Sequence, residues 1–375
     1  MRVDQLSLKN FRNLDPIVLK MDPHLNIFHG QNAQGKTNLL ESIWMFTGFH
    51  SFRNAKDKEI IQFGKPITKA EISFEASNRQ QEASITLGKN QKVYQLNQVT
   101  LQSQTDLSGE FCAVIFSPEH LSLVKDGPLA RRNFLDNAIF PLHPRHAAIL
   151  SAYRKTLIQR NALLKDIPHH PELLDTLDIW DERLAKLGGL ILLARTHYLH
   201  HLLPKVQFFH QSISNGKESA TFSYTSTQEL QNFLNGSDLR AEDIQHKLLH
   251  DIQESRSLDI KTGMSNVGPH RDDLDIKIGG ISARTFASQG QQRTAALALK
   301  LGEASVLSEI LGEPPVLLLD DVFSELDQAR RAYLTEHIRD MQVFITCCEP
   351  EKPLTKFGTV FTVQQGKISP DHTVS

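Results

Sequence analysis

One stretch decides the fold: Gly30-Gln31-Asn32-Ala33-Gln34-Gly35-Lys36-Thr37. It fits the phosphate-loop pattern G-x-x-x-x-G-K-[ST]. The stretch Leu25-Asn-Ile-Phe-His29 before it predicts a short strand, and apolar residues at helical spacing after it predict a helix to about Thr47. A glycine turn that matched the pattern by chance would not be expected to lie between a strand and a helix. A strand, a glycine turn and a helix N-terminus bring backbone N–H groups and the positive end of a helix dipole to one point. The sequence therefore predicts a polyphosphate site, with Lys36 on the β/γ-phosphates and the Thr37 hydroxyl on Mg²⁺.

A second apolar run, Pro315-Val-Leu-Leu-Leu-Asp320-Asp321, ends in two carboxylates. This is the Walker B pattern, in which the carboxylate at the end of a buried strand holds Mg²⁺. Many buried strands end in Asp, so the pattern alone says little. In a chain that also has a phosphate loop, it assigns Asp320 to the metal.

A third motif, Ser288-Gln-Gly-Gln291, stands where the pattern changes to a helix over Thr294–Leu311. Glycine between small polar residues at a helix N-terminus is again an anion site. The loop 267–273, Val-Gly-Pro-His-Arg-Asp-Asp, feeds a predicted strand, and its charge density suggests a functional loop, although a plain hairpin entry is possible.

Composition bounds the class of protein. The chain has 375 residues, more than one compact core usually covers, so we expect two lobes. The formal net charge is −2, so any contact with nucleic acid must come from a local basic face. There are 3 cysteines and none has C-x-x-C spacing, which argues against a disulfide framework or a zinc ribbon and fits a reducing compartment. A signal peptide and an apolar run of the roughly 20 residues that span a membrane are both missing, so we expect a cytoplasmic protein with no membrane partner.

The remaining pattern predicts an α/β fold in two parts. Short strands over residues 2–29, an antiparallel meander over 68–101 and a buried strand over 111–116 surround the phosphate loop. We expect a discontinuous head, 1–127 and 260–375, with a mixed sheet and an antiparallel β subdomain. An inserted, mainly helical lobe, 128–259, is expected to carry dimer, DNA or partner surfaces; its longest run is interrupted by Gly188-Gly189 and followed by Pro204.

Two groups of side chains in these parts allow more than one interpretation. His197, His200 and His201 lie at helical spacing and could bind a metal, but no acidic or cysteine ligand follows at ligand spacing, so surface histidines are favoured. Several basic residues are candidates for DNA contact, although a solvated face is the simpler interpretation: Lys9, Arg12, Arg131 and Arg132.

The order of the three motifs resembles that of the ABC-type ATPases. The resemblance implies that Ser288, Gly290 and Gln291 form the signature motif, which acts in trans on the nucleotide of a second copy. Lys36 and Asp321 become the catalytic residues, with Asp321 polarising the attacking water. ATP and Mg²⁺ are the implied cofactors, and an ATP-dependent homodimer is the implied assembly.

Within that class the chain is similar to the RecF family of SMC-like ATPases. The motifs that carry this resemblance are Phe116–Glu119, Arg131–Asp136, Gly268–Asp273, Ser288–Arg293 and Leu318–Asp327. The resemblance implies an ATP-dependent DNA-binding protein that acts in DNA repair, recombination, replication and the SOS response to DNA damage. It would bind double-stranded DNA and single-strand/double-strand gap junctions, and load the RecA recombinase with the RecO and RecR proteins.

Two departures bear on the alternatives. Transporter-type heads place a glutamine after the strand that precedes the helical lobe and a histidine after the last core strand; here these places hold Ser117-Pro-Glu119 and Thr346-Cys-Cys-Glu349. Both argue against fast hydrolysis and against a transporter ATPase subunit. We expect slow hydrolysis that releases the dimer, as a weak ATPase activity that DNA stimulates. An SMC-like chromosome protein would need long heptad arms, and a nuclease would need a further acidic domain.

Overall fold

The computed structural model describes residues 1–53, 55–227, 230–231, 234, 239–350 and 357–371. The chain divides into two compact units. We call Met1–Leu121 with Arg293–Ser375 the head unit, and Ser122–Gln292 the insert unit. The insert unit therefore also takes in residues 260–292, which the sequence had grouped with the head, because the strand after Asp272 pairs with a strand of the insert.

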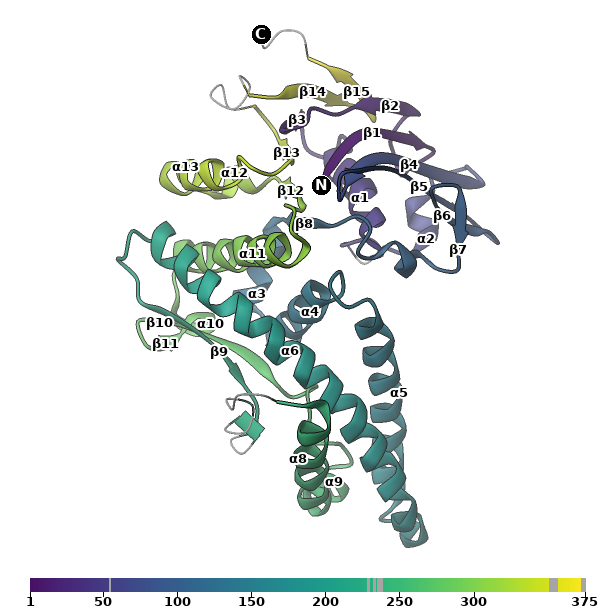
Figure 1. Ribbon diagram of the computed structural model, residues 1–375, viewed down its shortest axis with the longest axis vertical. Helices are drawn as coiled ribbons and strands as arrows, with labels where there is room; N and C mark the ends of the chain where they lie inside the picture. Colours follow the sequence, from purple (N-terminus) through teal and green to yellow (C-terminus); the bar gives the residue numbers. More distant parts are fainter. Residues whose placement is uncertain (54, 228–229, 232–233, 235–238, 351–356, 372–375) are drawn as a thin grey trace. The chain divides into compact units, whose positions relative to one another are not determined.

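A six-stranded sheet of mostly parallel strands forms the centre of the head unit, in the order β15-β14-β3-β13-β12-β8 (Figure 1). Its strands, in chain order, are β3 (Leu25–His29), β8 (Ala113–Phe116), β12 (Val316–Asp320), β13 (Val343–Cys347), β14 (Thr359–Gln364) and β15 (Lys367–Pro370). Strands β3, β12 and β8 are buried at almost every residue, because both faces of the sheet are covered here. Among these six strands, only β15 runs antiparallel to its neighbour.

The second sheet of the head unit is antiparallel, in the order β2-β1-β4-β5-β6-β7. Its strands are β1 (Arg2–Lys9), β2 (Ile17–Lys20), β4 (Ile67–Ala76), β5 (Arg79–Gly88), β6 (Lys92–Leu96) and β7 (Val99–Leu101). The alternation of buried and half-exposed residues along β4 shows that one face meets the core and the other meets water. The predicted meander is confirmed.

The phosphate-loop helix α1 (Lys36–Trp44) belongs to the core that the two sheets share. Leu39, Leu40 and Ile43 of α1 lie in one buried cluster with Phe74 of β4 and Phe344 of β13. Burial of each such side chain contributes about 1.5–3 kcal/mol. Packing from both sides therefore fixes the helix whose first turn would receive the phosphates.

The other helices of the head unit are short, apart from α11, which begins in the insert unit and continues into the head. Their bounds are α2 (Asp57–Ile60), α11 (Gln289–Leu311), α12 (Val322–Glu325) and α13 (Gln328–His337), with 3-10 turns η1 (Met45–Thr47), η2 (Gln104–Leu107) and η3 (Pro118–Leu121). No helix among the described residues is both long and apolar enough to cross a membrane.

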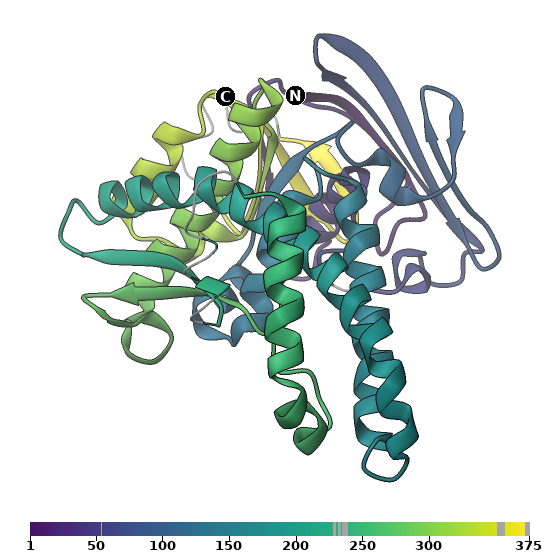
Figure 2. The same ribbon diagram turned by 60° about the horizontal axis from the view of Figure 1, so that its bottom comes forward.

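The insert unit combines helices with a small sheet of order β11-β10-β9 (Figure 2). Its elements are α3 (Ser122–Lys125), α4 (Pro128–Ile139), α5 (Arg145–Asp166), η4 (Pro171–Thr176), α6 (Leu177–Ile213), β9 (Ala220–Thr225), α8 (Ala241–Glu254), α9 (Arg256–Thr262), β10 (Asp273–Ile278), β11 (Ile281–Ser282) and α10 (Ala283–Phe286).

Helix α6 corrects the expectation of an interrupted run. It continues through Gly188-Gly189 and contains Pro204. At Gly189 a Cβ atom would lie 3.2 Å from the Gln245 nitrogen of α8, so the glycine serves the close packing of two helices rather than a break.

Candidate nucleotide site

The phosphate loop joins β3 to α1 through two glycines that no other residue could replace. Gly30 has φ +154, and a Cβ there would lie 2.2 Å from the Val363 carbonyl oxygen. Gly35 has φ +114, and a Cβ there would lie 2.7 Å from Leu14 Cδ2. Because the backbone is this close to its neighbours, the loop keeps its shape and presents the N–H groups at the start of α1.

Lys36 is buried, and its ammonium lies inside the loop. Nζ donates to the carbonyl oxygens of Gly30 at 2.5 Å and Gln31 at 2.9 Å. An ammonium has three donors, so one remains for a phosphate oxygen. The loop residues Gln31, Asn32 and Ala33 are exposed, which leaves its rim open to a ligand.

Asp320 and Thr37 meet at the end of β12, as expected of a shared magnesium site. Asp320 Oδ1 accepts hydrogen bonds from Thr37 Oγ1 at 2.9 Å and from Thr346 Oγ1 at 2.7 Å. Burial raises the pKa of the Asp320 carboxyl, and the neighbouring Asp321 carboxylate raises it further. A hydroxyl and a carboxylate are the hard oxygen ligands that suit Mg²⁺, and a cation there would offset the buried charge.

Asp321 is held in an unusual backbone conformation. Its φ is +53, in the left-handed region, and its N–H donates to Thr346 Oγ1 at 3.0 Å. Among the described residues, none donates to its buried Oδ1 atom. An oriented carboxylate with an unused acceptor is what a water-polarising group requires, and this role stays a prediction.

Thr346 is a site residue that the motifs did not single out. It is fully buried near the end of β13, 26 positions after Asp320 in sequence, and its hydroxyl bonds the Asp320 carboxylate and the Asp321 backbone N–H. A threonine after an apolar run gives no signal of its own, but its place at the carboxyl end of a core strand beside Walker B could have found it.

The signature stretch begins α11. The Ser288 N–H donates to Gln291 Oε1 at 2.9 Å, and the Gln291 N–H donates to Ser288 Oγ at 3.3 Å. This reciprocal capping box explains why the helix begins here. Ser288 is exposed and Gly290 and Gln291 are partly exposed, so the turn is accessible to a ligand.

The structure places three of the four DNA candidates in ion pairs or against backbone carbonyls. Arg12 holds Glu41, which is fully buried, through Nε–Oε2 at 2.5 Å and Nη2–Oε1 at 2.7 Å, and so ties the loop after β1 to α1. Arg131 is buried and pairs with Asp273 through Nε–Oδ1 at 2.7 Å. Arg132 donates to the Asp272 carbonyl at 2.6 Å. These contacts favour structural roles, whereas Lys9 is exposed.

The loop 268–273 also lies within a buried polar network of the insert unit. Tyr224 donates to Asp272 Oδ2 at 2.7 Å, Arg195 donates to the Pro269 carbonyl at 2.7 Å, and Tyr153 and His270 Nδ1 lie 2.7 Å apart. Polar groups of this loop therefore form hydrogen bonds that stabilise the fold of the insert unit.

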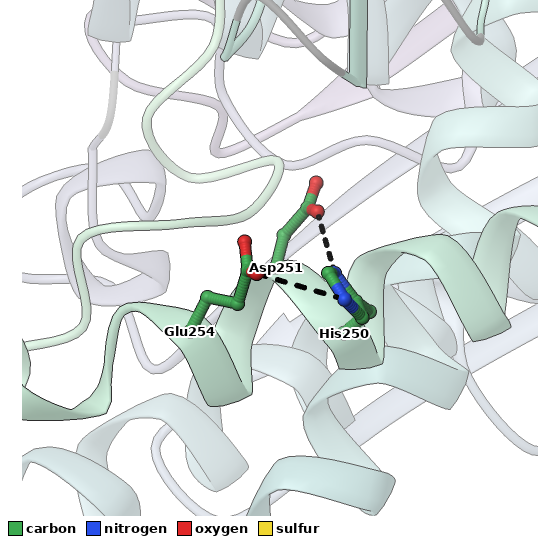
Figure 3. Close-up of side chains that lie close together, drawn as sticks. All are labelled: His250, Asp251 and Glu254. Carbon is green, nitrogen blue, oxygen red and sulfur yellow. Dashed lines mark ion pairs between the residues drawn. The ribbon is translucent and has the colours of Figure 1, made fainter.

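The predicted histidine cluster does not form a metal site in the described part of the chain. His197, His200 and His201 are exposed on α6. The one metal-like group found there is His250, Asp251 and Glu254 on α8 (Figure 3). In that group the two carboxylates approach opposite nitrogens of one imidazole, each at 3.6 Å, so a single ion could not use both contacts.

The phosphate loop, Thr37, Asp320 and the two sheets together define an ATPase head of the ABC type. The family model "RecF/RecN/SMC N terminal domain" matches residues 2–368. The chain belongs to the RecF family. It is 38% identical over 353 residues to the DNA replication and repair protein RecF of Acetivibrio thermocellus, covering 94% of each chain. It is 37% identical over 372 residues to that of Agathobacter rectalis, covering 98% of this chain and 99% of the relative.

Solved structures agree with this assignment. A recombination mediator protein RecF–ATPrS of the RecFOR pathway superposes with a TM-score of 0.87 at 36% identity, covering 98% of this chain and 97% of that one. An SMC head bound to the winged-helix domain of ScpA superposes with a TM-score of 0.57 at 12% identity, which shows a common fold alone.

Proposed function

We propose that this chain is an ATP-dependent DNA-binding protein of gap repair. Two copies would associate when each binds ATP and Mg²⁺, and the dimer would hold double-stranded DNA at a single-strand/double-strand junction. Slow hydrolysis would then release it. RecO and RecR would be its partners in loading RecA, in the cytoplasm.

The observation that carries the ATP part of the proposal is the uncompensated charge of Asp320 opposite Thr37. A buried carboxylate with a raised pKa and only neutral donors is poised for a cation. The relatives support the nucleotide and the pathway, since two RecF structures of the RecFOR pathway were solved with ATPrS and with ATP.

The proposal assigns each motif a part in one cycle. Gly30–Thr37 would bind the phosphates, with Lys36 on the β/γ-phosphates, and Thr37 and Asp320 would hold Mg²⁺, which neutralises the developing charge. Asp321 would orient the attacking water. Ser288, Gly290 and Gln291 of the second copy would cover the γ-phosphate through the exposed start of α11, so that neither copy completes a site alone.

The test combines ATP turnover with molecular mass. We expect the purified chain to hydrolyse ATP slowly, gapped duplex to stimulate it several-fold, and light scattering to show a dimer with ATP. Lys36→Met removes the ammonium and should abolish both ATP binding and the dimer. Lys186→Met, at an exposed lysine of α6, is the matched control and should change neither. Rapid turnover without DNA, or no DNA binding at low salt with ATP, would contradict the proposal.

A further inference from the structure

A fully exposed aromatic ring stands at the turn between α2 and β4. Phe63 has a relative exposure of 101%, the highest among the exposed large apolar side chains of the described residues. Single exposed apolar residues are common and need no explanation by themselves. This one is distinguished by the backbone that fixes it and by the charges around it.

The backbone on both sides of Phe63 is anchored. The Lys65 N–H donates to the Gln62 carbonyl at 3.0 Å, and Gly64 has φ +76, which fits a type II turn with Phe63 at its second position. The Gln62 N–H donates to the Asn10 carbonyl at 2.9 Å. The turn is thus tied to the end of β1, and its ring projects from a fixed platform.

Further bonds tie the segments on either side of the turn to the same place. The Arg12 N–H donates to the Ile60 carbonyl at 2.7 Å, and Asn10 Nδ2 donates to the Ile67 carbonyl at 3.1 Å. A binding element that is already ordered loses little conformational entropy when a ligand arrives.

Three exposed lysines lie on the segments that meet at this turn. Lys9 ends β1, Lys58 lies on α2 and Lys65 closes the turn. Within the described ranges, no carboxylate lies within 4.0 Å of these three ammonium groups. The nearby Asp57 is neutralised by Lys92, with which it forms an ion pair.

One acidic side chain remains in this segment. Glu59 is exposed, and its Oε2 accepts the backbone N–H of Lys56 at 3.1 Å at the start of α2. The segment 53–69 otherwise carries Arg53, Lys56, Lys58, Lys65 and Lys69, of which Lys69 forms an ion pair with Glu71. The surface is therefore basic even though the whole chain has a formal charge of −2.

We propose that this turn is a subsite for single-stranded DNA, in which an unpaired base stacks on Phe63 while Lys9, Lys58 and Lys65 meet the flanking phosphates. The inference rests on the proposed function and names how the junction is read. Aromatic stacking with a basic track is how single strands are bound without sequence preference. A base inside a duplex has no free face, so the ring selects the single-stranded side of a gap, whereas the lysines serve either side.

The chemistry disfavours an anionic lipid surface as the ligand. An interfacial membrane element buries a continuous apolar face. Here Phe63 is flanked by Gln62, Gly64 and Lys65, so one ring would be all that enters the lipid.

The experiment measures DNA affinity of the full chain with ATP, using a gapped duplex and a blunt duplex of equal length. Phe63→Ala should weaken binding to the gapped DNA about tenfold, because stacking of one base is lost, and leave the blunt duplex unchanged. Phe63→Trp should restore the affinity. With 2-aminopurine in the gap, the wild type should quench its fluorescence and Phe63→Ala should not.

Controls separate this inference from the proposed function. Phe357→Ala removes another exposed ring of the head unit, 72% exposed, and should have no effect. Lys65→Ala should weaken both DNAs and lower the salt dependence by about one ion. If the wild type binds neither DNA, the proposed function fails. If it binds both and Phe63→Ala binds gapped DNA equally well, or loses only binding to phosphatidylserine vesicles, the subsite alone is overturned.

Discussion

Two buried aspartates, one in each unit, show how differently the chain treats charge. Asp136 in α4 is 6% exposed and Asp320 in β12 is 7% exposed. Burial raises the pKa of both. At Asp136 the hydrogen bond from His146 and the pair with Arg195 outweigh burial, so its pKa is lowered. At Asp320 the hydrogen bonds from the Thr37 and Thr346 hydroxyls lower the pKa by less than burial raises it, so the net pKa of Asp320 is raised.

The difference separates structural charge from functional charge. Arg195 compensates Asp136 through Nε–Oδ1 and Nη2–Oδ2, both at 2.9 Å, so this carboxylate needs no further cation. Among the described contacts, no cation forms an ion pair with Asp320. Its buried charge therefore destabilises the ligand-free chain, and a bound metal ion would offset that penalty. Of these two buried carboxylates, Asp136 is compensated by an arginine and, in the part of the chain that the structure describes, Asp320 is hydrogen-bonded by hydroxyls alone.

The largest expected effect comes from a substitution at Asp136, the carboxylate that Arg195 compensates. Asp136→Asn leaves the Arg195 charge buried and places an amide nitrogen against its Nη2 donor. Removing one partner of a buried pair costs about 3–5 kcal/mol. We expect the free energy of unfolding in urea to fall by that amount, while the head unit's ATP binding at low urea survives.

The matched control for that substitution is Asp166→Asn, at an exposed aspartate of α5. Its free energy of unfolding should stay within about 0.5 kcal/mol of the wild type. An equally small change for Asp136→Asn would show that the pair with Arg195 is not compensating a buried charge.

At Asp320, which has no compensating cation among the described contacts, we expect the free energy of unfolding to rise when the charge is removed. Asp320→Asn keeps Oδ1 as the acceptor for both hydroxyls and removes the uncompensated charge, so the ligand-free chain should gain about 0.5–2 kcal/mol at pH 7. Turnover of ATP with Mg²⁺ should be lost, because the metal ligand is gone. Denaturant unfolding and phosphate release measure the two outcomes.

The pH dependence of this gain follows from the raised pKa. A carboxyl whose folded pKa exceeds the unfolded value contributes stability below the unfolded pKa and loses it as pH rises through the folded pKa. The advantage of Asp320→Asn should therefore vanish at pH near 3 and grow as pH rises through the folded pKa. Asp340→Asn, at an exposed aspartate of the head unit, should show no such pH dependence. A constant gain at all pH values would mean that charge is not its cause.

Local patterns predicted the head unit better than the insert. Strand β12 is a short apolar run that ends in carboxylates, and β3 leads directly into the first glycine of the phosphate loop, so the positions of both strands and the meeting of Thr37 with Asp320 followed from sequence. Helix α6 was predicted to be interrupted, because glycine and proline are read as breakers. Glycine can instead serve a close helix contact, which depends on α8 and is invisible locally.

Long-range pairing explains the rest. Arg131 and Asp273 are 142 positions apart, and a sequence shows both as charged surface candidates until the fold brings them together. The same holds for Thr346, which is an ordinary strand residue until β13 lies beside β12. Charge in a sequence therefore marks candidates, and burial decides which of them are structural.

The smallest expected effect tests how much the Thr346 hydroxyl contributes to the position and pKa of Asp320. Thr346→Val keeps the side-chain volume but removes the donor to Asp320 Oδ1 and the acceptor of the Asp321 N–H. The Asp321 N–H still reaches the Thr346 carbonyl at 3.2 Å, so the loss should be about 1 kcal/mol of stability. The pKa of Asp320 should rise further, so turnover should need more Mg²⁺ and a higher pH, while ATP binding without metal is unchanged. Thr346→Ser retains the hydroxyl and should restore the metal dependence. If valine and serine behave alike, the hydroxyl of Thr346 does not position the Asp320 carboxylate.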